Sequence, residues 1–62
     1  MTLEQRHTLI DRVVRHVERA YPRMVPGAVF EVAVATLARD HGLTVTPDEI
    51  VRVLSQLAEA AP

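Results

Sequence analysis

The chain has 62 residues, of which 48% are hydrophobic, and it carries a formal net charge of −1 and no cysteine. A domain of this length buries only about 60% of its unfolded surface, so its core is marginal unless disulfides, a metal or association add stability. The lack of cysteine excludes disulfides and thiolate metal sites, and the near-zero charge does not indicate nucleic acid or an anionic membrane as a partner. We therefore expect one domain, residues 1–62, that associates with protein.

The sequence carries no targeting pattern. No apolar run reaches the ~18–20 residues of a membrane span, and the start, MTLEQRHTLIDR, has no signal-peptide hydrophobic region. We expect a cytoplasmic protein. Met1 and the capped start of the first helix favour a complete chain.

The first predicted helix covers residues 3–20. Thr2 is a suitable N-cap, and Gln5 three residues later completes a capping box. An apolar stripe at helical period follows, and Arg6 is the one charge within it. The stripe consists of Leu3, Ile10, Val13, Val17 and Ala20.

A line of arginines runs along another side of this helix. We call it the arginine ridge, and it consists of Arg12, Arg15, Arg19 and, beyond the helix, Arg23. Such a ridge, duplicated in a dimer, could follow a nucleic-acid backbone without selecting a sequence. The other interpretation is a solvated face of mixed charge, because Asp11 and Arg15 have the spacing of an ordinary helix-surface ion pair.

The second predicted helix, residues 27–41, follows a joint that contains Pro22 and Pro26. Its sequence, AVFEVAVATLARDH, is apolar on nearly every side, and a strand is the rival interpretation because valines alternate in VFEVAV. The length, the alanines and the ending on Gly42 favour a helix. A helix that is apolar all round is normally buried, and two short neighbours hardly cover it.

We therefore expect this helix to meet another chain. One of its faces is formed by Phe30, Val34 and Leu37, whereas Val29 and Val32 point away from that face. The residues that we expect at an interface are Tyr21, Met24, Val29, Phe30 and Val32. The alternative is that these residues fill the core of their own chain, and for Phe30 that alternative is the stronger one.

The third predicted helix, residues 47–60, has the clearest local signals. Thr46 is its N-cap, Pro47 stands at the first helical position, and Glu49 completes a T-x-x-E capping box. Val45 and Ile50 have the spacing of a hydrophobic staple. The apolar face of this helix consists of Ile50, Val53, Leu54, Leu57 and Ala61.

The second and third helices together have the order of a helix-turn-helix DNA-binding unit. The turn GLTVT is longer than the usual tight turn, and the residues that would enter the major groove first are Asp48 and Glu49. Carboxylates at that position repel phosphate, and Arg52 is the only cation on the helix. This pattern is more typical of two packed helices than of a DNA reader.

Catalysis finds little support in the sequence. Glu4 and His7 have an E-x-x-H spacing, which occurs in di-iron carboxylate bundles, but no second copy of the motif is present. There is no glycine-rich phosphate loop and no recognisable nucleophile. We expect no catalytic residue, no metal and no cofactor.

The pattern RAYPRMVP…LTVTPDEIVRVLSQLAEA resembles one group of small uncharacterised actinobacterial helical proteins. The matching positions are Tyr21, Pro22, Pro26, Leu43, Asp48, Glu49, Ile50 and Leu57. The resemblance implies an all-helical fold and no particular activity.

Together these patterns predict an all-α, compact three-helix bundle that is oligomeric. The leading hypothesis is a non-catalytic protein–protein interaction module, either a small homodimer or an accessory subunit that docks on a larger protein through an apolar helix. The alternative is a small dimeric helix-turn-helix-like regulator that binds DNA through Arg12, Arg15, Arg19, Arg23 and Arg52.

Overall fold

The computed structural model describes residues 1–60 and contains three helices in that range. They are α1 (Leu3–Ala20), α2 (Pro26–His41) and α3 (Pro47–Ala60). The predicted all-α fold and the three helix positions are confirmed. Ala61, which the sequence placed on the apolar face of the third helix, lies outside the described residues.

The helix ends follow from local sequence. The Thr2 hydroxyl accepts the Gln5 amide and the Gln5 side chain accepts the Thr2 amide, so the predicted capping box is present. At the end of α2, Gly42 adopts a left-handed conformation with φ of 62°, which suits glycine because it has no Cβ. The amides of Gly42 and Leu43 both donate to the Leu37 carbonyl and terminate the helix.

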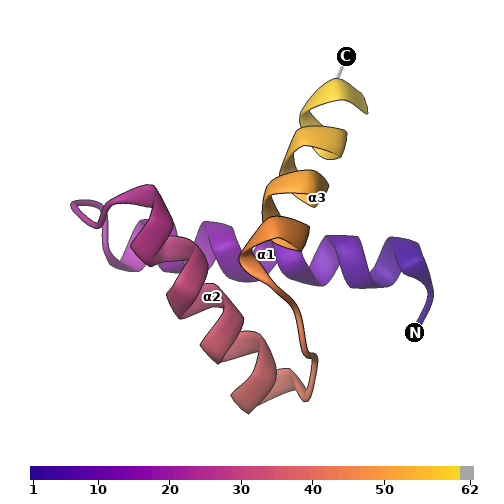
Figure 1. Cartoon of the computed structure of the whole chain (residues 1–62), viewed down its shortest axis with the longest axis horizontal. Helices are drawn as coiled ribbons and strands as arrows, with labels where there is room; N and C mark the ends of the chain where they lie inside the picture. The colour runs from indigo at the N-terminus through magenta and orange to yellow at the C-terminus, as the bar shows by residue number, and fades with distance from the viewer. Residues whose placement is uncertain (61–62) are drawn as a thin grey trace.

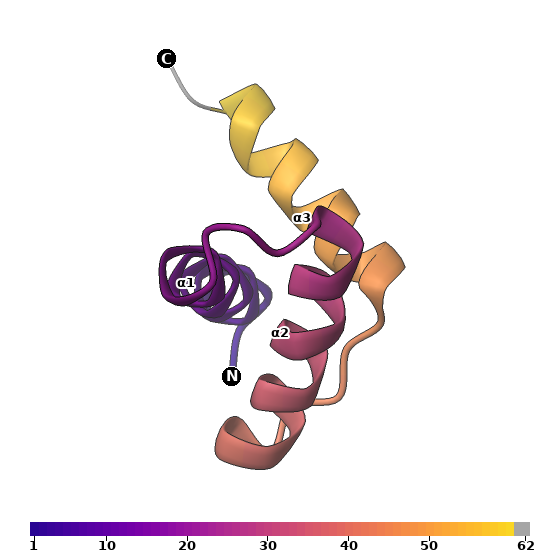
Figure 2. The same cartoon turned by 90° about the vertical axis from the view of Figure 1, so that its left-hand side faces the viewer.

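The helices form two layers. α1 crosses α2 and α3 on one side, and in Figure 2 it is seen nearly end-on beside them. α3 rises across the middle of α1, and its C-terminal half continues past α1 (Figure 1). The molecule measures 28 × 27 × 18 Å along its principal axes, so it is flat. Among residues 1–60, no helix covers the side of α2 and α3 that faces away from α1 (Figure 2).

The core lies where α1 crosses the other two helices. Among residues 1–60 it contains ten buried residues: Ile10, Val13, Val14, Val17, Val29, Ala33, Leu37, Val45, Ile50 and Val53. The face of α2 that enters it consists of Val29, Ala33 and Leu37, which are spaced four residues apart. Of the face that the sequence suggested, Leu37 is buried in the core, and Phe30 and Val34 are partly buried against it. Val29, which we expected to point away from that face, points into the core. The small Ala33, fully buried, lets α1 approach α2 closely at their crossing.

The exposed apolar surface that we expected on α2 lies elsewhere on the chain. The large hydrophobic side chains that remain exposed are Met1, Leu3, Tyr21, Val25, Val51 and Leu57. The outward side of α2 instead carries small residues such as Ala35 and Ala38, which add little apolar area. Among residues 1–60, no helix has both the length and the apolar character that crossing a membrane requires.

Candidate functional site

A polar clamp joins the first turns of α1 to the start of α3. The Nε of Arg6 donates to one carboxylate oxygen of Glu49 at 2.7 Å, and its Nη2 donates to the other at 2.9 Å. The same Nη2 donates to the Thr44 carbonyl at 2.9 Å. Arg6 is the one charged residue within the apolar stripe of α1. Its charge is tolerated there because it pairs with Glu49, 43 residues away in the sequence.

The clamp changes the role predicted for Glu49. The Thr46 hydroxyl accepts the Glu49 amide at 3.2 Å, so Thr46 caps α3 as expected. The Glu49 carboxylate, however, binds the Arg6 guanidinium instead of completing the capping box. The hydrogen bonds from Arg6 lower the pKa of Glu49 below its ordinary value of 4.5, despite partial burial. The clamp therefore joins α1 to α3 and fixes the start of α3.

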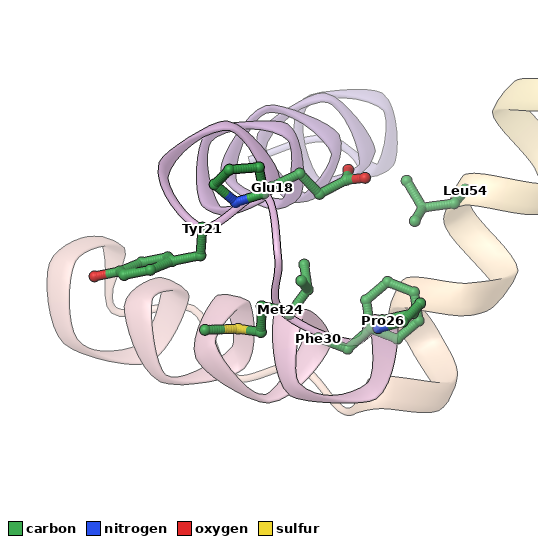
Figure 3. Close-up of a pocket in the computed structure, with 8 residues that line it drawn as sticks. Glu18, Tyr21, Met24, Pro26, Phe30 and Leu54 are labelled. Carbon is green, nitrogen blue, oxygen red and sulfur yellow. The ribbon is translucent and has the colours of Figure 1, made fainter.

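An open hollow lies at the other end of α1, where that helix meets the Tyr21–Val25 joint, α2 and α3. Its volume is about 310 Å³, and its lining includes Glu18, Tyr21, Met24, Pro26, Phe30 and Leu54. Figure 3 shows these side chains, with the Glu18 carboxylate directed across the hollow toward Leu54. Most of the lining side chains are apolar, and Glu18 and Tyr21 are the lining residues with polar side-chain groups.

A second hollow of about 290 Å³ adjoins the first, with which it shares Glu18 and Leu54. It is lined by Asp11, Arg15, Glu18, Leu54, Leu57 and Ala58. We call the two hollows together the α1–α3 groove. It has an apolar floor and a charged rim, as binding sites for amphipathic helices commonly do.

The structure brings three of the five predicted interface residues together. Tyr21, Met24 and Phe30 line the first hollow, and Tyr21 is 53% exposed. Val29 is at the back of the same hollow but only 4% exposed, so it belongs to the core and the prediction that it faces a partner was wrong. Val32 is half-buried against the core and does not line the groove.

Sequence reasoning missed the contribution of α3 to this surface. Leu57 has the same helical register as the buried Ile50 and Val53, yet it is 38% exposed. Leu57 lines a hollow together with Asp11 and Arg15 of α1, so α1 covers it only in part. The long apolar face of the third helix was the one available signal, since it continues beyond the reach of two short neighbours.

The structure divides the predicted nucleic-acid residues. The four arginines of the ridge are exposed: Arg12, Arg15, Arg19 and Arg23. Arg15 binds Asp11, its Nε lying 3.0 Å from both carboxylate oxygens, as the i,i+4 spacing predicted. Arg52 lines a different hollow beside Glu49 and does not extend the ridge. The DNA-binding alternative therefore rests on the arginine ridge of α1 and the joint that follows it.

The residues considered for a metal do not converge. Glu4 and His7 line different hollows, and Glu4 is exposed. Within residues 1–60, no three His, Asp or Glu side chains gather closely enough to hold a metal ion.

Comparison with protein-family models, with curated proteins and with solved structures finds no match. The surface geometry of the chain itself is therefore what supports a function.

Proposed function

We propose that the chain is a non-catalytic protein–protein interaction module that binds an apolar helical segment in the α1–α3 groove. The observation that carries the proposal is the open groove itself. It places partly exposed large side chains from all three helices and the first joint on one continuous surface, and Tyr21, Met24 and Leu57 are among them. Surfaces of this kind mark binding sites on small proteins.

The total accessible surface supports association. It is 4558 Å², whereas a compact monomer of 6.9 kDa is expected to expose roughly 4,000 Å². The excess of roughly 550 Å² means that the chain is more open than a compact monomer of its mass. The groove contributes to that open shape, because it leaves apolar surface that a partner can cover.

The proposal is tested by photo-crosslinking in cells at a groove position and at a control position. A photoreactive benzoylphenylalanine is introduced in place of Tyr21, at the groove, and separately in place of Ala35, which is exposed on α2. We expect one discrete adduct from position 21, identified by mass spectrometry, and no corresponding adduct from position 35.

The groove must also be needed for that adduct. Adding Leu57→Gln to the position-21 variant is expected to abolish it, since an amide in the apolar floor is left without a hydrogen-bond partner. Equal diffuse labelling at both positions, or an adduct that Leu57→Gln does not change, contradicts the proposal.

A further inference from the structure

The proposed function leaves the occupant of the groove open, and the following inference rests on that function. We infer that the occupant is a second copy of this chain, related by a two-fold axis, whose Leu57 enters the first hollow while the first copy does the same in return. The contact is between the C-terminal halves of two α3 helices and the α1 helices beside them.

The first reason is that the groove contains both a partly exposed leucine and a cavity. Leu57 is 38% exposed and lines the second hollow, and the first hollow, lined by Tyr21, Met24 and Phe30, adjoins it. A two-fold contact requires one patch to be complementary to itself. A leucine beside a hollow that can accept a second leucine allows such a contact.

The second reason is the charge pattern on the rim. Arg15 and Glu18 both line the groove and are three residues apart on α1, so they face the same side. A two-fold axis brings Arg15 of each copy to Glu18 of the other and forms two reciprocal ion pairs. The Arg15 side chain is 69% exposed and its bond to Asp11 lies at the surface, so it can reorient at small cost.

The test is a charge exchange at the rim, with mass in solution as the measurement. Glu18→Arg gives a chain with two cations at these positions, and Arg15→Glu gives a chain with two anions. Each variant alone repels its own copy, so we expect its dimer to be at least about tenfold weaker than the wild-type dimer. An equal mixture of the two is expected to recover wild-type association as a heterodimer, which native mass spectrometry distinguishes from either homodimer.

The matched control is Arg12→Glu, which makes the same charge change on α1 outside the groove and should leave the dimer unchanged. Circular dichroism establishes that each variant is folded. If the wild-type chain is a monomer, or if the mixture associates no better than its components, the inference is wrong. A position-21 adduct to a different protein then leaves the proposed function standing, whereas the absence of any adduct removes both.

Discussion

Replacing Glu49 by glutamine should destabilise the fold more than removing the charge of an exposed acid such as Asp48. The Arg6–Glu49 pair is bidentate, and its side chains are only 29% and 21% exposed. Hydrogen bonds to charged groups contribute about 1.5–3 kcal/mol when well buried, and fully exposed ion pairs about 0–1 kcal/mol. We place Glu49→Gln between these limits, at about 1–2 kcal/mol of lost unfolding free energy.

That loss is large for this chain. A domain of this size is stabilised by only about 3–5 kcal/mol, and each kcal/mol shifts the melting temperature by about 4–8 °C. Thermal unfolding followed by circular dichroism should therefore show a fall of roughly 5–15 °C. The control is Asp48→Asn, which removes a neighbouring charge from the same first turn of α3, so the helix-dipole effect is matched.

A double-mutant cycle with Arg6→Met isolates the pair itself. We expect a coupling free energy of about 1 kcal/mol between positions 6 and 49. The reasoning is refuted if Glu49→Gln costs no more than Asp48→Asn, or if the cycle shows no coupling.

The same pair predicts a dependence on pH. Because Arg6 lowers the pKa of Glu49 in the folded chain below its ordinary value of 4.5, the clamp contributes its full stability above that value. The contribution is lost as the pH falls through the lowered pKa of the folded state. The difference in melting temperature between the wild-type chain and Glu49→Gln should therefore shrink from pH 5 downward, and a difference that stays constant contradicts the assignment.

Three further predictions concern the core, the turns and the arginine ridge. Leu37→Ala, at a fully buried position, should lower the free energy of unfolding by about 2–5 kcal/mol and leave most of the chain unfolded at 25 °C. Urea titration measures this loss, and a small loss means that the core is not centred on Leu37. Gly42→Ala should destabilise the fold by about 1–2 kcal/mol, because alanine is strained at a φ of 62°. Gly27→Ala should stabilise the fold by about 0.5–1 kcal/mol, because an added Cβ there meets nothing within 4 Å. Equal effects of the two substitutions would argue against the left-handed turn. Fluorescence anisotropy with duplex DNA at low salt should detect no binding, and binding that weakens steeply with added salt would revive the DNA-binding alternative.

Local features of this fold are readable from the sequence. The caps at Thr2 and Thr46, the left-handed Gly42 and the positions of all three helices depend on residues within a few places of each other. Short-range signals of this kind do not require knowledge of the tertiary structure. That is why the helix positions were predicted correctly.

The errors concern tertiary packing. α2 is apolar on nearly all sides, so its sequence does not determine whether Val29 or Phe30 turns toward α1, and the packing against α1 decides it. The partner of Glu49 could not be found because Arg6 lies 43 residues away. The exposure of Leu57 depends on where α3 crosses α1. The helical period of the sequence gives no information about that crossing.

The measurement that tests the central claim most directly is the mass of the purified wild-type chain in solution, by light scattering over a range of concentrations. A second copy in the α1–α3 groove predicts that the mass rises with concentration from 6.9 kDa toward twice that value. A folded chain whose mass stays at 6.9 kDa at every concentration contradicts it.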